Sequence, residues 1–552
     1  MTPDDLADAI TAAVRAAVAA GELILETIPD AKVERPKNRE HGDWSTNVAM
    51  QVAKPSGLAP RVIAEILQPR IAATPGVTRV DIAGPGFLNI TLDAASAGEL
   101  ARTILTEGAS YGHTSVMGGV TVNVEFISAN PTGPLHLGHA RWAAVGDAIA
   151  SVLETSGAIV TREFYINDRG VQLDNFGRSL MAAAQGDPTP ENGYSGLYIT
   201  EIAQQIVATT PGITDLPDDE KLVAFREAGY QLQLDLQRQT LDNFRTHFDV
   251  WYSERALHES GAVERGMARL REQGHLFEAD GALWLRTTDF GDDKDRVLIK
   301  ADGDLTYFAA DIAYYVDKRD RGFEVCIYLL GADHHGYVGR LKAVAGTAGD
   351  DPNVNIEVLI GQLVKMMKNG EEVRLSKRAG NILLLDDLVD EVGVDAARYT
   401  LIRYPVDSPL VLDVDLLVSR TNDNPVYYVQ YAHARLASLL RNAAELGIDW
   451  QSADFDPALL SHEREGELIG VLAQYPRVVA TAAELREPHR VARYLEELSG
   501  AYHRFYDACR VLPRGDESAD ATTTARLWLS AAARQVLANG LDTLHVTAPE
   551  RM

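Results

Sequence analysis

Cysteine is almost absent from the sequence, and its scarcity restricts both the redox setting and the metal chemistry. Only Cys326 and Cys509 occur among 552 residues, far apart along the chain. A disulfide framework and a cysteine-rich zinc site are therefore excluded, and we expect no structural zinc. So few cysteines fit a reducing compartment, and we expect a cytoplasmic protein.

Long apolar runs are also missing, and so is a basic N-terminus. No stretch approaches the roughly 20 apolar residues that a membrane-spanning helix needs. The first residues are acidic, where a secretory signal peptide would be basic. We therefore expect no association with a membrane. The contents of 46% hydrophobic and 24% charged residues describe a globular chain, whose length suggests roughly three or four domains.

Basic residues are scarce relative to acidic ones. The chain has 52 Lys and Arg against 79 Asp and Glu, which gives a net charge of −27. This balance argues mildly against a nucleic-acid partner, because phosphates bind to basic surfaces. It does not exclude one, since a local track of Arg and Lys suffices for phosphate contacts while the acidic remainder limits indiscriminate binding.

Residues 122–166 predict a strand, a helix and a second strand in succession. Apolar side chains alternate from Val122 to Phe126, and a Pro- and Gly-rich break follows at 131–134. Apolar residues then recur at helical spacing until Gly157, and an apolar run occupies 158–166. This is a βαβ unit, whose first strand-to-helix turn lies at the carboxyl edge of a parallel sheet, where such folds bind ligands.

Two histidines flank a glycine at that turn, in the segment His136-Leu137-Gly138-His139. Free amides and the helix dipole at a helix N-terminus favour phosphate. An imidazole can donate hydrogen bonds to phosphoryl oxygens as their charge grows in a transition state, and the glycine leaves room for a flat base. The alternative is a pair of capping histidines without further function. Placement at the strand–turn–helix edge favours the catalytic interpretation.

These residues carry a resemblance to a known family. His136 to His139 look like the HIGH motif of class I aminoacyl-tRNA synthetases, and the longer segment from Val124 to Arg141 resembles arginyl-tRNA synthetases. The resemblance implies a catalytic role for both histidines and ATP binding by His136, Gly138 and His139. The motif residues are Asn130, Pro131, Thr132, Gly133, Pro134, Leu135, His136, Leu137, Gly138 and His139.

A second catalytic segment is expected at Arg374-Leu375-Ser376-Lys377-Arg378. A mobile ammonium there can follow a pyrophosphate group as the bond between the α- and β-phosphates breaks. The alternative is a solvated basic turn. The segment resembles the KMSKS loop, with Arg in place of the first Lys and of the last Ser, which implies a catalytic and ATP-binding Lys377. Many arginyl enzymes lack this Lys and carry one just before the His motif; here Gly133-Pro134 occupies that position, consistent with a Lys at 377.

A third polar cluster, Asp333-His334-His335, follows the apolar run 324–330. A metal site is one interpretation, but no supporting Cys or third ligand stands at a suitable spacing. The resemblance implies contacts with the nucleotide ribose or the substrate amino group instead. We expect Asp333 in the ATP site and His334 in the arginine site, although the sequence does not decide which of the two makes which contact.

An arginine-selective pocket needs planar acceptors for a guanidinium. The segment 305–315 is expected to be helical, and a spacing of four places Tyr307, Asp311 and Tyr315 on one face. A Tyr–Asp pair on a helix is often only a surface hydrogen bond. The resemblance implies that Tyr307 and Asp311 hold the guanidinium, and that Glu125 and Asn130 also bind the substrate.

The whole chain is expected to form a multidomain α/β protein of three parts. Residues 1–112 predict an α+β domain, 113–410 a Rossmann-like catalytic domain with a mainly helical insertion at about 179–295, and 411–552 a bundle of helices. In the family, the first part contacts the tRNA elbow and the last binds the anticodon. The resemblance implies a monomeric arginine–tRNA ligase that uses L-arginine, tRNA(Arg), and ATP with Mg²⁺.

Two other functions remain open from the sequence. A class I synthetase of another specificity is disfavoured by the Tyr307 and Asp311 pair. A non-catalytic tRNA-binding relative is disfavoured by the presence of His136, His139 and Lys377.

Overall fold

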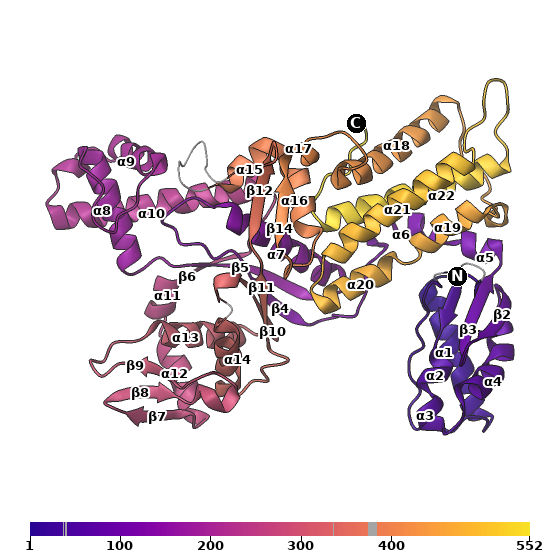
Figure 1. Ribbon diagram of the computed structural model, residues 1–552, viewed down its shortest axis with the longest axis horizontal. Helices are drawn as coiled ribbons and strands as arrows, with labels where there is room; N and C mark the ends of the chain where they lie inside the picture. Colours follow the sequence, from indigo (N-terminus) through magenta and orange to yellow (C-terminus); the bar gives the residue numbers. More distant parts are fainter. Residues whose placement is uncertain (37, 39–40, 335, 374–382) are drawn as a thin grey trace.

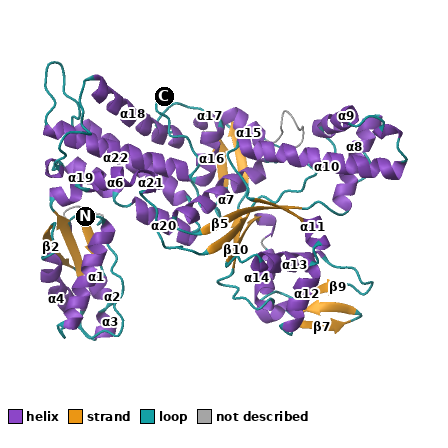
Figure 2. Ribbon diagram, turned by 180° about the vertical axis from the view of Figure 1, so that it is seen from behind, coloured by secondary structure: helices purple, strands orange, loops and turns teal. Residues whose placement is uncertain are grey.

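The computed structural model describes residues 1–36, 38, 41–334, 336–373 and 383–552. A parallel sheet occupies the middle of an elongated molecule. The N-terminal unit is attached to the helical bundle at one end (Figure 1). Figure 2 shows the same arrangement from behind, with the N-terminal unit again next to the bundle and away from the sheet.

The central sheet is five-stranded and wholly parallel. Its strand order is β11-β10-β4-β5-β6. The strands are β4 (Thr121–Glu125), β5 (Ile159–Ile166), β6 (Val250–Ser253), β10 (Val325–Gly331) and β11 (Ile356–Gly361). Helix α7 (Leu137–Thr155) connects β4 to β5, as the βαβ pattern predicts. Residues Val325 to Leu329 of β10 are all buried, which suits a strand covered on both faces. The expected α/β class is therefore confirmed.

The segment between β5 and β10 contains more strand than the sequence pattern suggests. Its helices are α8 (Val171–Gln185), α9 (Leu197–Thr209), α10 (Asp218–Asn243), α11 (Glu254–Glu259), α12 (Ala262–Glu272) and α13 (Tyr307–Asp320). Strand β6 joins the central sheet as its edge, and β7 (Leu276–Ala279), β8 (Ala282–Leu285) and β9 (Arg296–Ile299) form a separate antiparallel sheet. Strands of four residues are too short to produce a clear period of two. Asp280-Gly281, both with positive φ, is the sequence signal of the first hairpin.

The chain between β10 and the bundle returns to the central sheet and then forms a small mixed one. It contains η5 (Ala332–His334), α14 (Tyr337–Thr347), β12 (Val364–Lys368), β13 (Glu371–Glu372), α15 (Leu385–Val392), α16 (Val394–Ile402), β14 (Leu410–Asp413) and α17 (Val414–Leu417). Strand β12 pairs with β13 and β14.

The N-terminal unit packs helices on a three-stranded antiparallel sheet of order β1-β3-β2. Its elements are α1 (Pro3–Ala19), β1 (Trp44–Thr46), α2 (Val48–Gln51), α3 (Ala53–Ser56), α4 (Pro60–Ala72), β2 (Val77–Ala83), β3 (Phe87–Leu92), α5 (Ala94–Gly98) and α6 (Leu100–Glu107). The N-terminus of α1 is fixed by a capping box between Thr2 and Asp5, and the apolar stripe from Leu6 to Ala17 is buried.

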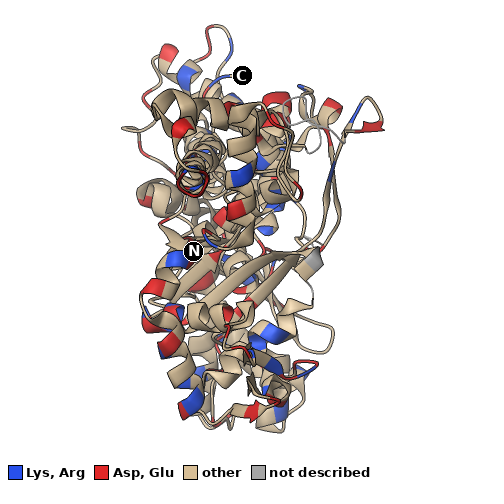
Figure 3. Ribbon diagram, turned by 90° about the vertical axis from the view of Figure 1, so that its left-hand side faces the viewer, with Lys and Arg blue, Asp and Glu red and all other residues tan. Residues whose placement is uncertain are grey.

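The C-terminal region is helical, as its sequence predicts. Its helices are α18 (Pro425–Glu445), α19 (Glu463–Leu472), α20 (Tyr475–Leu485), α21 (His489–Ala508) and α22 (Ala521–Thr543). In the described part of the chain, no helix combines the length and the apolarity needed to cross a bilayer. Acidic and basic residues are scattered over the upper and lower parts of the molecule in Figure 3, so the charged residues are not confined to one part of the chain.

A buried ion-pair cluster fixes α7 relative to the rest of the molecule. Asp147, on α7, accepts from Arg398 on α16 (2.6 Å) and from Arg162 on β5 (3.2 Å), and His545 Nδ1 lies 2.5 Å from its carboxylate. Burial would raise the pKa of Asp147, but these partners lower it to about 2. Arg398 also donates to the backbone carbonyls of Phe244 and Leu544. The helix that follows His136 is thus tied to the end of α10 and to the end of the bundle.

Candidate active site

The two histidines of the HIGH-type motif cap the helix on which they lie. His136 is the N-cap of α7, and its Nδ1 accepts from Gly138 N (3.1 Å). The Nδ1 of His139 accepts in turn from His136 N (3.2 Å). The rings stack with centroids 3.8 Å apart. Because both Nδ1 atoms are acceptors, each ring carries its proton on Nε2.

Both imidazoles are neutral at neutral pH. Burial lowers the pKa of His136, and burial together with the neighbouring His136 lowers the pKa of His139 to about 3. A neutral ring with its proton on Nε2 is a hydrogen-bond donor without charge. Capping and catalysis are therefore compatible, because the cap uses Nδ1 and leaves each Nε2–H for a ligand.

Gly138 is required by the position of the His136 ring. A Cβ at residue 138 would lie 2.8 Å from Cε1 and 2.9 Å from Nδ1 of His136. A larger residue would displace the ring, and with it the donor that the cap orients.

The chain that follows the second catalytic segment is attached to this turn. Leu137 N donates to Leu383 O (2.8 Å), and Leu385 N donates to Leu135 O (3.0 Å). Lys377 itself, with the rest of Arg374–Arg378, lies outside the described residues. The backbone six residues after Lys377 is nevertheless fixed beside the His motif.

The turn between β4 and α7 is held by the insertion. Gln237, on α10, donates to the carbonyls of Asn130 (3.0 Å) and Gly133 (2.8 Å), and the Tyr198 hydroxyl donates to Thr132 O (3.2 Å). Thr132 and Leu135 are buried. Hydrogen bonds from α9 and α10 thus fix the backbone of the HIGH-type motif at the edge of the sheet.

Three carboxyl groups from three elements interact at the carboxyl edge of the central sheet. Glu125 ends β4, Asp311 lies on α13, and Glu254 begins α11. The pKa of Asp311 is raised to about 7: burial is the main cause, Arg340 opposes it, and the charges of Glu125 and Glu254 add to it. Burial likewise raises the pKa of Glu254, which is 7% exposed. The raised pKa values show that the nearby cations do not fully balance these carboxyl groups, so a cationic ligand would stabilise their ionised forms.

Glu254 is a site residue that the sequence interpretation missed. It hydrogen-bonds the Tyr165 hydroxyl, and Asn167, in the amide orientation that its neighbours favour, donates to its Oε2 (2.8 Å). Strand β6 lies in a segment that we expected to be helical. The sequence interpretation therefore did not place Glu254 at the carboxyl end of a sheet strand. The signal that could have found it is the short run of β-branched and aromatic residues in Val250–Ser253.

The other predicted arginine-site residues lie at the rim or elsewhere. Tyr307 begins α13 with its side chain 81% exposed. Asn130 is exposed and donates to Gln172 Oε1 (2.8 Å), and His334 is exposed on η5. Tyr315 does not share the site of Asp311, since its hydroxyl donates to Asp350 (2.9 Å). The side chains of Asp333 and His335 lie outside what the structure describes.

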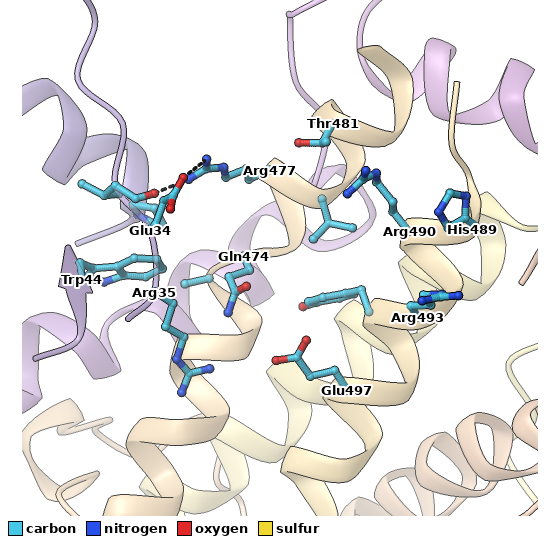
Figure 4. A pocket seen from close by; sticks show the side chains of 15 residues that line it. Glu34, Arg35, Trp44, Gln474, Arg477, Thr481, His489, Arg490, Arg493 and Glu497 are labelled. Carbon is cyan, nitrogen blue, oxygen red and sulfur yellow. Dashed lines mark hydrogen bonds and ion pairs between the residues drawn. The ribbon is translucent and has the colours of Figure 1, made fainter. Parts of the chain in front are cut away.

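A large cavity lies far from this edge of the sheet, at the junction of the N-terminal unit and the bundle. It measures about 620 Å³. Glu34, Arg35 and Trp44 face helices α20 and α21 across it (Figure 4). Four arginines, one histidine and two glutamates carry its charged groups: Arg35, Arg477, Arg490, Arg493, His489, Glu34 and Glu497.

Three family models match successive parts of the chain. The arginyl-tRNA synthetase N-terminal domain matches residues 4–92, the class I (R) tRNA synthetase catalytic domain matches 101–193 and 215–404, and the DALR anticodon-binding domain matches 429–552. An arginine–tRNA ligase of Renibacterium salmoninarum is 60% identical over 556 residues, with each chain fully covered. The chain belongs to the arginyl-tRNA synthetase family. The family resemblance found in the sequence is confirmed.

Other members of the arginyl-tRNA synthetase family agree in sequence and fold. The arginine–tRNA ligase of Kineococcus radiotolerans is 56% identical over the full length of both chains. The arginyl-tRNA synthetase structure from Thermus thermophilus has a TM-score of 0.76 at 22% identity, again with both chains fully covered. The methionyl-tRNA synthetase of Mycobacterium tuberculosis shares the fold less closely, with a TM-score of 0.55 at 14% identity over 77% of this chain and 91% of that one.

Proposed function

We propose that the chain is an arginine–tRNA ligase in which the edge of the central sheet holds both small substrates. Arginine's carboxylate attacks the α-phosphate of ATP to give arginyl-adenylate and diphosphate. The arginyl group then passes to the 3′-terminal adenosine of tRNA(Arg), and AMP leaves. The observation that carries this proposal is that one edge of the central sheet holds both features: Glu125 and Glu254 stand at the carboxyl ends of β4 and β6 and interact with Asp311, and the connection from β4 leads to the capped histidine pair at the start of α7.

ATP binds at the N-terminus of α7. His136 and His139 direct their Nε2–H groups to the phosphates, Gly138 leaves space for the nucleotide, and Asp333 contacts the ribose. Lys377 approaches from the second catalytic segment and stabilises the departing diphosphate. The neutral state of both histidines supports these roles, because a neutral donor binds a phosphoryl oxygen without requiring protonation at low pH.

Arginine binds with its guanidinium among the buried carboxylates. Asp311 and Glu254 accept from its planar donors, Glu125 fixes the substrate from the end of β4, and Tyr307, Asn130 and His334 complete the site from its rim. A forked cation matches planar acceptors, and its positive charge offsets the burial and the like charges that together raise the pKa of Asp311.

Mg²⁺ enters with ATP. Within the described ranges, no group of three or more His, Cys, Asp or Glu side chains is arranged to hold a metal ion. Mg²⁺ commonly keeps several water ligands and binds through substrate phosphates, so a dedicated protein cage is not needed for it. When bound, the ion neutralises charge on the β- and γ-phosphates.

The tRNA spans the N-terminal unit, which contacts its elbow, and the bundle, which binds its anticodon. The arginine-lined cavity at their junction supports a contact with the sugar–phosphate backbone, because its cations come from both units in a chain that is otherwise strongly acidic (Figure 4). All three substrate sites belong to one chain, so we infer a monomer. The two free, buried cysteines fit a cytoplasmic enzyme.

Reversing the charge of Arg493 is expected to weaken the use of tRNA. Arg493→Glu should raise KM for tRNA by about tenfold and reduce the salt dependence of tRNA binding by about one phosphate contact. KM for arginine and for ATP should stay within twofold. Arg271→Glu makes the same change on an exposed position of α12 and should leave tRNA use unaltered. An unchanged KM for tRNA in Arg493→Glu would show that the cavity is not part of the surface that binds tRNA.

Charging of total tRNA with each of the twenty amino acids tests the function itself. Arginine alone should be attached, in a reaction that consumes ATP. Attachment of a different amino acid would indicate another class I specificity. Tight tRNA binding without any charging would indicate a non-catalytic tRNA-binding protein.

A further inference from the structure

Lys318 is fully buried beside the carboxylates of the proposed arginine site. It lies on α13, seven residues after Asp311, with 0% of its surface exposed. Its Nζ donates to Glu125 Oε2 at 2.6 Å. The rings of Tyr314 and Tyr328 lie around the ammonium, with their centroids 4.3 and 4.0 Å from Nζ. Removing an ammonium from water is costly in free energy unless the ammonium is paired. The ion pair with Glu125 therefore stabilises Lys318 in its buried position.

A second carboxylate, Glu163, lies 4.0 Å from the same ammonium but has its own partners. Arg321 donates to both of its oxygens, at 2.5 and 3.0 Å, and the Tyr314 hydroxyl donates to Oε1 at 2.5 Å. The charge of Glu163 is therefore balanced mainly by Arg321. Lys318 remains as the counter-charge of Glu125.

Glu125 is held from two sides. Lys318 binds Oε2, and the Ser128 hydroxyl donates to Oε1 at 3.0 Å. Ser128 is itself fixed, because its oxygen accepts from Tyr165 N (3.1 Å) and its backbone has a positive φ of 42°. A carboxylate with both oxygens engaged has one orientation, and its remaining lone pairs point in fixed directions.

We propose that Lys318 is a positioning residue for arginine, acting through Glu125. It orients the carboxylate that meets the substrate, and it pairs with that carboxylate where Glu125 is buried. The negative charge that an entering guanidinium meets then comes from Asp311 and Glu254. This inference rests on the proposed role of Glu125 in binding arginine.

A double-mutant cycle in the full-length enzyme tests the coupling. Steady-state arginylation of tRNA is measured for Lys318→Met, Glu125→Gln and the double variant, with arginine and ATP varied in turn. Lys318→Met should raise KM for arginine by about tenfold and leave KM for ATP within twofold. In the Glu125→Gln background, the same change should alter KM for arginine by less than about twofold, because the side chain through which Lys318 acts is already neutral.

Arg321→Met is the matched control. It removes a cation from the same helical region that pairs with Glu163, and it leaves the contact between Lys318 and Glu125 intact. It should lower the unfolding temperature without changing KM for arginine. If Lys318→Met does not fold, Lys318→Gln, which still donates a hydrogen bond, replaces it in the same cycle.

The outcomes separate this inference from the proposed function. If Glu125→Gln leaves KM for arginine unchanged, Glu125 does not bind the substrate, and both the role of Glu125 and that of Lys318 are rejected. If Glu125→Gln raises KM but the Lys318 effect is additive with it, the positioning role alone is wrong. The positioning role is also wrong if Lys318→Met changes KM for ATP and for arginine equally, since that result indicates a general structural role.

Discussion

Replacing Asp311 with Asn is expected to lower kcat/KM for arginine by about a thousandfold, since breaking a buried charge pair costs about 3–5 kcal/mol. The substitution keeps the shape of the side chain and removes its charge. A guanidinium then faces an amide that can offer one acceptor and two donors, and the donors oppose its own.

The ATP site should not respond to this change. KM for ATP should stay within about twofold, because Asp311 approaches from α13 while the phosphates meet the start of α7. Asp320→Asn is the matched control, with the same substitution at an exposed position of the same helix. Normal arginine use by Asp311→Asn would place the guanidinium elsewhere.

The same carboxyl group predicts the pH dependence of arginine binding. The pKa of Asp311 in the free enzyme is about 7, so below that pH part of the enzyme carries a protonated carboxyl. Arginine affinity should therefore rise as the pH increases from 6 to 8, and this rise should be absent in Asp311→Asn.

The same pKa shift affects the stability of the folded protein in the opposite direction: stability falls as the pH rises, whereas arginine affinity increases. Because the folded pKa of Asp311 is raised from 3.8, its proton stabilises the folded state at low pH, and this contribution is lost as the pH rises toward 7. Without arginine, Asp311→Asn should consequently unfold at a higher temperature than the wild type at pH 8, and the gain should be smaller at pH 5.

Replacing Lys377 with Ala is expected to slow adenylate formation by about 10²–10³-fold, the usual effect of removing one group that stabilises transition-state charge. KM for arginine should change little, because the ammonium acts on charge that develops only as diphosphate departs. The hydrogen bonds between 383–385 and 135–137 support this role by fixing the following backbone beside the His motif.

Lys365→Ala serves as the control for this experiment. Lys365 lies on β12, is well exposed, and lies 3.8 Å from Glu372. Its removal should leave the activation rate intact. An unaltered rate in Lys377→Ala would instead assign the role to another cation, such as Arg374 or Arg378.

Local signals in the sequence were sufficient for the elements that carry the chemistry. The βαβ unit and helix α13 each depend on residues a few positions apart, and the structure contains both. The histidines do cap the helix, but the cap occupies only Nδ1 of each ring, so their catalytic role stays a prediction.

Features that depend on distant residues could not be predicted in the same way. Lys318 and Glu125 are 193 positions apart, and Asp147 and His545 are 398 apart. Neither pair leaves a periodic pattern in the chain, because each arises only when strands and helices pack. Glu254 was not predicted as a site residue for a related reason. The strand before it has only four residues and can be recognised as a strand only from its pairing in the sheet.

The central claim is that buried carboxylates select a charged guanidinium, and citrulline tests it most directly. Citrulline keeps the length and planarity of arginine but has a neutral ureido group. Equilibrium binding of both amino acids to the enzyme at pH 8 should show arginine bound at least about a hundredfold more tightly, as expected for a site built around a charge pair. Equal affinities would contradict the account, because the pocket would then recognise shape without charge.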